Sequence, residues 1–309
     1  MTELRRALDD YLRLRRSLGH KMAEAAWLLP DFVAFLEARG QTTVTIAAAL
    51  AWVSEREGDV VTTLSPRRIT AVRGFARYLS GADPATEIPP LGLLPHRQRW
   101  RQPFIYSDAD ITAIMTAAGE LGLPLRAATY RTLVGLLAAS GMRVGEAINL
   151  DHDDIDWAEG VLRIRETKFG KSRLVPLTPS SIDALREYSA LRDQVAPRPE
   201  DPSFFVSRTR RRLIYAVVAP TFRRLVTTAG VGADAPNPPR LHDLRHTFAV
   251  RALLTWYRTG GDVQAKIPSL STYLGHREPS STYWYLSAAP ELLALAAARR
   301  EGIGKAARS

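Results

Sequence analysis

Residues 239–254 read PRLHDLRHTFAVRALL, and residues 269–286 read SLSTYLGHREPSSTYWYL. Three of the chain's six histidines lie in these two segments, together with Arg245 and a group of tyrosines that ends at Tyr285. His242 and Arg245 are three residues apart, so on a helix they share one face. We therefore expect a helix that presents a histidine beside an arginine, followed along the chain by the tyrosines.

Three tyrosines in this region compete for a functional role. Tyr273 falls in a helical pattern with Leu270 and Leu274, which indicates a place in the core. Tyr283 and Tyr285 are two residues apart, so on a helix they point to nearly opposite sides. Only one of these two can face a pocket, and the other is left for packing or for a surface.

HDLRH also has the outline of the zinc-protease motif H-E-x-x-H, with His242 and His246 as ligands. Two features argue against a metal site. The acid is Asp243, which is shorter than the glutamate of that motif, and Arg245 places a fixed cation between the two ligands. His246 is more simply a hydrogen-bonding residue on the helix face, and we expect no metal.

The segment upstream of these residues predicts a mainly helical domain with a small antiparallel β-hairpin, over residues 105–300. Gly170 lies between two β-rich runs, VLRIRE (161–166) and SRLVPL (172–177), which is typical of a hairpin turn. Helical patterns surround the hairpin at about 108–122, 125–139, 180–195 and 215–229, with a short helix in GMRVGEAINL (141–150) and a last one from Pro290. Residues 301–309 form a tail.

Residues 1–85 predict a separate helical domain, and residues 86–104 a linker rich in proline and arginine. The fourth helix of this domain starts near Ser65-Pro66. Its arginines form either a solvated face or a face toward phosphates, and the linker is either a basic strap for DNA or a plain connection. The candidate DNA contacts in this half are Arg67, Arg68, Arg73, Arg77, Arg99 and Arg101.

The composition is that of a folded, strongly basic protein. The 309 residues carry a net charge of +10, with a pI of about 10.1, which favours a polyanionic partner such as DNA. There are no cysteines, which excludes disulfides and thiolate chemistry and fits a reducing compartment. The N-terminus lacks a signal-peptide core, and no apolar run is long enough to span a membrane. We expect a cytoplasmic protein.

These residue types suit the attack of a hydroxyl on a phosphodiester. The transition state gains charge on the non-bridging oxygens, and two arginines such as Arg143 and Arg245 can grip them with forked donors. A histidine can donate to the same oxygens or relay protons. A tyrosine can be the nucleophile if a cationic pocket offsets its usual pKa of about 10. A lysine on a hairpin can protonate the leaving oxygen.

Several motifs together resemble the tyrosine recombinase (phage integrase) family. They are Arg143 within SGMRVGEAINL (140–150), Lys168 on the hairpin, HDLRH (242–246), LGH (274–276) and a tyrosine nine residues beyond that histidine. The N-terminal half resembles the family's core-binding domain more diffusely. The resemblance implies a two-domain clamp on DNA, made of this domain and the family's catalytic domain.

The resemblance also implies roles for individual residues. It implies a catalytic set of Arg143, Lys168, His242, Arg245, His276 and Tyr285, with Tyr285 as the nucleophile. Lys168 competes with Lys171, which matches a flanking residue on the DNA backbone, and Arg173 is a further candidate DNA contact. Glu146 is interpreted as a support for Arg143, although Arg143 could simply bridge helices through it. His276, after Gly275, is open to either packing or phosphate contact.

The implied function is site-specific recombination without ATP, metal or cofactor. Tyr285 would form a 3′-phosphotyrosyl link, and strands would be exchanged through a Holliday junction. The resemblance implies that the protein is a monomer when free and forms a homotetramer on double-stranded DNA. Partner recombinases could also take part in this assembly. The tail from Pro290 would dock either on a neighbouring protomer or on its own domain.

Two other functions compete with this one. The first is an inactive accessory DNA-binding protein of the same fold, and the second is a type IB topoisomerase. The biological role is open among phage integration, transposition of a mobile genetic element, cassette capture and chromosome resolution. The chain shows no extra arm-binding domain at its N-terminus, which favours a simple recombinase or a mobile-element transposase.

Overall fold

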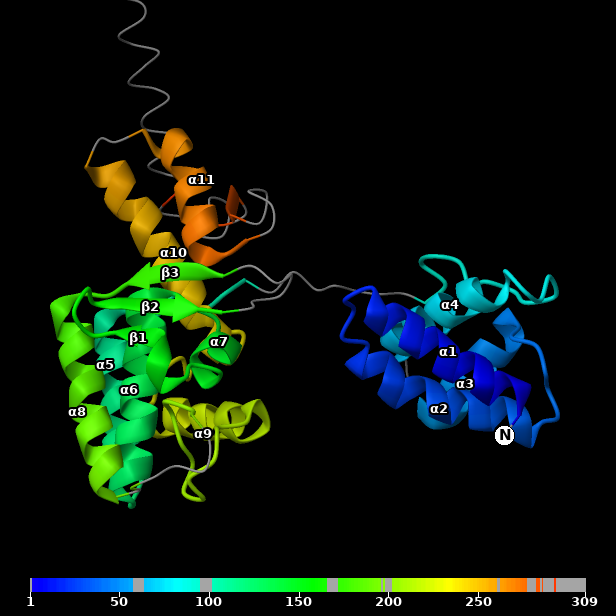
Figure 1. Ribbon diagram of the computed structural model, residues 1–309. Helices are drawn as coiled ribbons and strands as arrows, with labels where there is room; N and C mark the ends of the chain where they lie inside the picture. Colours follow the sequence, from blue (N-terminus) through cyan, green and yellow to red (C-terminus); the bar gives the residue numbers. More distant parts are fainter. Residues whose placement is uncertain are drawn as a thin grey trace, which may run out of the picture. The chain divides into compact units, whose positions relative to one another are not determined.

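The computed structural model describes residues 2–57, 64–94, 102–165, 172–195, 197, 202–259, 262–276, 282, 283, 285 and 292. The chain divides into two compact units, Met1–Trp100 and Arg101–Ser309. Lys168, Lys171, Arg99 and Arg101 lie outside the described residues, as does nearly all of the helix expected from Pro290. The described part is mainly helical with one small antiparallel sheet, which confirms the predicted fold class (Figure 1).

The described part of the first unit is a bundle of four helices around an aromatic core. Trp52, Phe32 and Phe75 are fully buried in it, and the indole of Trp52 donates to Asp31 at 2.9 Å. Burying a large apolar side chain contributes roughly 1.5–3 kcal/mol, so these residues supply much of the unit's stability. The helices are α1 (Glu3–Ser17), α2 (Ala23–Ala38), α3 (Ile46–Glu57) and α4 (Ser65–Leu79).

The second unit has a core built on α6, which packs against α5, α8 and α10. Its apolar residues Leu133 and Leu137 are buried, and α6 ends where Gly141 takes the left-handed conformation. The helices before the sheet are α5 (Asp108–Gly119), α6 (Pro124–Ser140), α7 (Val144–Ile148) and the 3-10 turn η1 (His152–Asp154). Those after it are α8 (Pro179–Val195), α9 (Tyr215–Thr228), α10 (Leu241–Arg258) and α11 (Val263–Leu274).

The sheet has three antiparallel strands in the order β1 (Ile155–Asp156), β2 (Val161–Ile164) and β3 (Arg173–Pro176). The sequence predicts β2 and β3 but not β1, because a two-residue strand shows no alternation. In the β2–β3 pairing Ile164 lies opposite Arg173, and Arg163 lies opposite Leu174. Ile164 is buried while Arg163 and Leu174 are exposed, so Arg173 lies on the inner face of the sheet. Helix α11 contacts β3 and is drawn above it in Figure 1.

A second core cluster joins α10 and α11 to the residues that follow them. Leu253 of α10 and Ile267 of α11 are fully buried, and Tyr285 belongs to the same cluster. The stretch quoted at the outset therefore folds as two helices that enclose Tyr285.

Candidate active site

Arg143 lies in the turn between α6 and α7, and Glu146 on α7 holds it. Its Nη1 donates to Oε1 of Glu146 at 2.8 Å, and its backbone N–H donates to Oε2 at the same distance. Nη2 donates to the carbonyl of Gly275 at 2.8 Å. The side chain stays 32% exposed, so part of the guanidinium faces outward while the glutamate anchors it from within.

Arg245 is buried on α10, where two backbone carbonyls hold its guanidinium. Nη1 donates to Gly141 at 2.9 Å and Nη2 to Leu274 at 2.6 Å. Burial, and then the charge of Arg143, lower its pKa to about 10. The guanidinium therefore remains a cation at neutral pH. Two arginines that are distant in sequence are thus brought to one place.

Tyr285 packs against the same arginines. It is 2% exposed, whereas Tyr283 is 42% exposed. Its hydroxyl accepts a hydrogen bond from Arg245. Burial raises the pKa of this hydroxyl above its usual value, although Arg245 and Arg143 act to lower it. The expected cationic pocket therefore acts to lower the pKa of the tyrosine, but in the DNA-free protein the loss of hydration outweighs the two charges.

Two histidines pack against Tyr285, and a third packs against one of them. The ring centroid of Tyr285 lies 6.1 Å from that of His276, in a stacked arrangement, and 5.4 Å from that of His246. The rings of His246 and His242 are 4.6 Å apart. Nδ1 of His276 shares a hydrogen bond with Oγ1 of the buried Thr282 at 2.7 Å, which fixes its ring.

All three histidines are neutral near pH 7. Burial is the main cause, followed by nearby arginine or histidine charges. These lower the pKa to about 4 for His242 and His276 and to about 3 for His246. A neutral imidazole can accept a proton at one nitrogen and donate from the other, as a proton relay requires.

Tyr273, which the sequence assigns to the core, is partly buried and stacks on Phe248 with ring centroids 5.4 Å apart. Among the residues that the structure describes, no three histidine or carboxylate side chains gather where they could hold a metal ion.

Arg173 takes a different place from the DNA contact that the sequence predicts. Its side chain is 11% exposed and turned inward. Nη1 and Nη2 donate to the two oxygens of Glu146 at 3.0 and 2.7 Å, and Nε donates to the carbonyl of Tyr273 at 2.8 Å. The guanidinium of Arg173 therefore makes its hydrogen bonds within the protein. Arg173 lies beside Glu146 in the site and not on an outer basic surface.

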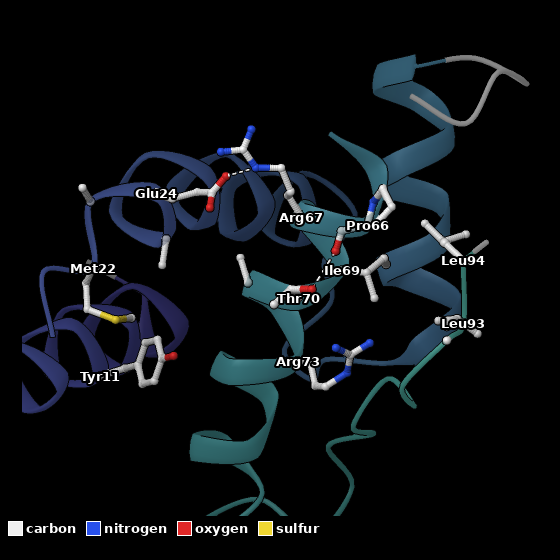
Figure 2. A pocket seen from close by; sticks show the side chains of 14 residues that line it. Tyr11, Met22, Glu24, Pro66, Arg67, Ile69, Thr70, Arg73, Leu93 and Leu94 are labelled. Carbon is white, nitrogen blue, oxygen red and sulfur yellow. Dashed lines mark hydrogen bonds and ion pairs between the residues drawn. The ribbon is translucent and has the colours of Figure 1, made fainter. Parts of the chain in front are cut away.

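The arginines of α4 differ in the interactions that they make within the protein. Arg67 pairs with Glu24, and Arg73 donates to the carbonyls of Pro89 and Pro90. Figure 2 shows Arg67 and Arg73 on the wall of a cavity of about 570 Å³ between α2, α4 and the chain near Leu93. Arg68 lies over the ring of Trp52, 5.4 Å from its centroid, and Arg77 is exposed.

The sequence does not reveal two parts of this arrangement, the role of Arg173 and that of Thr282. It also does not reveal that Gly141 and Gly275 offer carbonyls to the arginines. A glycine directly after each of two helices is the one signal that could have pointed to these carbonyls, because both end their helix in the left-handed conformation.

Comparison with known proteins identifies the family. The model of the phage integrase family matches residues 106–291. A putative integrase/recombinase, y4rB, of Sinorhizobium fredii (strain NBRC 101917 / NGR234) is 43% identical over 308 residues, which span 97% of this chain and 98% of that protein. The chain therefore belongs to the phage integrase family, the tyrosine recombinases, and is a site-specific DNA recombinase.

Solved structures show the same fold. The integrase of transposon Tn1549, in complex with transposon right end DNA, superposes with a TM-score of 0.64 at 16% identity, covering 96% of this chain and 99% of that one. A λ integrase tetramer bound to a Holliday junction gives a TM-score of 0.59 at 18% identity, covering 91% of this chain and 76% of that one. No helix in the described part of the chain is long and apolar enough to cross a membrane.

Proposed function

We propose that this recombinase cuts DNA with Tyr285. The phenolic oxygen attacks the scissile phosphorus, the bond from phosphorus to the 5′ oxygen breaks, and a 3′-phosphotyrosyl link and a free 5′-hydroxyl result. A 5′-hydroxyl of a partner strand then attacks that link and releases Tyr285. Each step exchanges one phosphodiester for another, so neither ATP nor a metal is needed. The proposal is carried by the arrangement around Tyr285: Arg143 and Arg245 act on its hydroxyl, and His246 and His276 pack against its ring, with His242 behind His246.

Arg143 and Arg245 are assigned to the non-bridging oxygens. A guanidinium has five N–H donors. Arg143 uses one hydrogen of Nη1 on Glu146 and one of Nη2 on Gly275, and Arg245 uses one of Nη1 on Gly141 and one of Nη2 on Leu274. The remaining N–H groups can donate to the phosphate. Because the arginines are already held in place, the transition state gains these hydrogen bonds without the cost of ordering them.

Protons move at two atoms during cleavage. The pKa of Tyr285 is raised, so its proton must leave as the oxygen attacks, and the neutral ring of His276, which stacks on Tyr285, can take it. On the leaving side we assign Lys168, from the sequence, to protonate the 5′ oxygen. Glu146 takes the supporting role, since it fixes Arg143 from the protein side.

The substrate is proposed to be a double-stranded recombination site, with strands exchanged through a Holliday junction by a tetramer. The basic charge of the chain supports a DNA partner. The λ integrase tetramer on a Holliday junction and the Tn1549 integrase on transposon DNA share the fold and support such an assembly. We favour a simple recombinase or a mobile-element transposase that acts in the cytoplasm, with partner recombinases as an option.

Covalent trapping tests the nucleophile. Nicked duplexes with a randomised core lose the 5′-hydroxyl end after cleavage, so any adduct accumulates and its sequence can be recovered. The wild-type protein should become attached to a subset of these duplexes. Tyr283→Phe should behave like the wild type, because Tyr283 is exposed, whereas Tyr285→Phe should form no adduct. An adduct with Tyr285→Phe would show that the nucleophile is another residue.

The trapping result and two plasmid assays separate the alternatives. A topoisomerase would relax a supercoiled plasmid that lacks the recovered site, and a recombinase would not. An accessory protein would bind the duplexes and form no adduct at all. Recombination between two plasmids that each carry the recovered site is the outcome that supports strand exchange.

A further inference from the structure

The carboxyl end of α11 holds three arginines from three other parts of the fold. Its consecutive carbonyls at Tyr273, Leu274 and Gly275 accept from Arg173, Arg245 and Arg143, at 2.8, 2.6 and 2.8 Å. The partial negative charge of a helix carboxyl end favours cations there. The position of α11 therefore sets the position of both arginines proposed to grip the phosphate.

Arg173 ties this helix end to Glu146. The carboxylate of Glu146 receives both arms of the Arg173 fork and, on the same two oxygens, Nη1 and the backbone N–H of Arg143. Burial would raise the pKa of Glu146, but these hydrogen bonds outweigh burial and lower it. Glu146 is therefore an anion with four donors, and removing Arg173 would leave it half satisfied.

The fit around Arg173 is close. A Cβ atom at Gly275 would lie 2.9 Å from Nη1 of Arg173, so a side chain at Gly275 would displace this guanidinium. Gly275 has a φ of +68°, which glycine adopts most readily. A lysine at position 173 would keep the charge but lack the planar fork that reaches Glu146 and Tyr273 together.

We propose that Arg173 is a positioning residue of the recombinase: it locks Glu146 to the carboxyl end of α11 and so sets Arg143 and Arg245 at the spacing that the scissile phosphate requires. It acts through these arginines and does not contact DNA. The inference rests on the proposed function, in which Arg143 and Arg245 bind the non-bridging oxygens.

The test compares Arg173→Met and Arg173→Lys with Arg163→Met. Arg163 is a matched control, since it lies on the outer face of β2 and its loss removes the same charge. Adduct formation is measured on the recovered duplex at saturating protein, alongside DNA affinity and the thermal unfolding temperature. A displacement of reacting groups by about 1 Å can cost on the order of 100-fold, so we expect a loss of that size for Arg173→Met.

DNA affinity should change no more for Arg173→Met than for Arg163→Met. Arg173→Lys should unfold near the wild-type temperature, but its cleavage should remain slower than that of the wild type. The lysine keeps the charge, whereas the proposed role requires the planar guanidinium fork. A duplex with a methylphosphonate at the scissile position carries less charge on the non-bridging oxygens and depends less on the arginines. On this duplex the deficit of Arg173→Met relative to the wild type should shrink.

Three results would overturn the proposal. Wild-type cleavage rates in Arg173→Met or Arg173→Lys would reduce Arg173 to a structural ion pair. Weaker DNA binding with an unchanged rate at saturation would make Arg173 a DNA contact. If Arg173→Met lost the same factor in cleavage rate on the phosphate and the methylphosphonate duplex, Arg173 would not act through Arg143 and Arg245. Absence of any adduct with the wild-type protein is a separate result, which would overturn the proposed function itself.

Discussion

Replacing Gly141 by alanine should destabilise the catalytic unit and displace Arg245. Gly141 has a φ of +60°, and its carbonyl accepts from Arg245. A Cβ atom here would lie 2.7 Å from Cγ of Phe248, and nearer still to its Cδ1. Phe248 cannot retreat freely, because it stacks on Tyr273.

The magnitude has two parts. The left-handed conformation costs a non-glycine residue about 1–2 kcal/mol. Overpacking against a constrained ring costs a further 1–3 kcal/mol or so, and the lower entropy of the unfolded alanine chain returns about 0.4–1 kcal/mol. The net loss is about 2–4 kcal/mol. At roughly 2–4 °C per kcal/mol for a unit of this size, the unfolding temperature should fall by about 4–16 °C.

Scanning calorimetry of the whole chain measures this loss, with two control glycines from the same unit. Gly122 has a φ of +70° with nothing near its Cβ position, so Gly122→Ala isolates the backbone cost, a net loss of about 1 kcal/mol or less. Gly145 lies in α7 with open space around it, and Gly145→Ala should be neutral or stabilising by about 0.5–1 kcal/mol. If Gly141→Ala unfolds at the same temperature as Gly122→Ala, the steric argument about Phe248 is refuted.

Three further predictions concern the histidines, Thr282 and α4. The folded pKa values of His242, His246 and His276, about 3 to 4, lie below the usual 6.5, so the unfolded chain binds more protons and stability should fall as the pH drops from about 6.5 to 4. Urea unfolding of His246→Asn should show a shallower pH dependence than the wild type, and an equal dependence would contradict these shifts. Thr282→Val should slow adduct formation by up to about 100-fold at unchanged DNA affinity, because His276 loses the bond that fixes its ring, whereas Thr272→Val, on the exposed side of α11, should not. Arg77→Ala should lower the salt dependence of DNA binding by about one ion, since Arg77 is exposed, and Arg73→Ala should change it less because Arg73 bonds to Pro89 and Pro90; the reverse order would place Arg73 on DNA.

Local pattern was enough to predict much of this protein. The helical periods of residues 1–85 and of α5 to α10 are visible in the sequence because an amphipathic helix repeats its apolar residues every three to four positions. The spacing of His242 and Arg245 places both on one face of α10, and the two-residue spacing of Tyr283 and Tyr285 separates them. The family, too, follows from the order and spacing of motifs, and comparison confirms it.

Only the tertiary structure decided how the site is held together. The arginines are held by the carbonyls of Gly141, Leu274 and Gly275. Every residue carries a carbonyl, so apart from the two glycines that follow helices nothing in the sequence marks these three. Whether Arg173 faces DNA or Glu146 depends on which face of β3 is covered, which a four-residue strand does not reveal.

The protonation states of the site residues also depend on the tertiary structure. The sequence predicts cations that act to lower the pKa of Tyr285, and they do, yet burial outweighs them and the pKa is raised. The sign depends on how much water the fold removes from the hydroxyl compared with how near it brings Arg245 and Arg143. Residue types and spacings determined which groups take part, and burial, which depends on the whole fold, decided their charge.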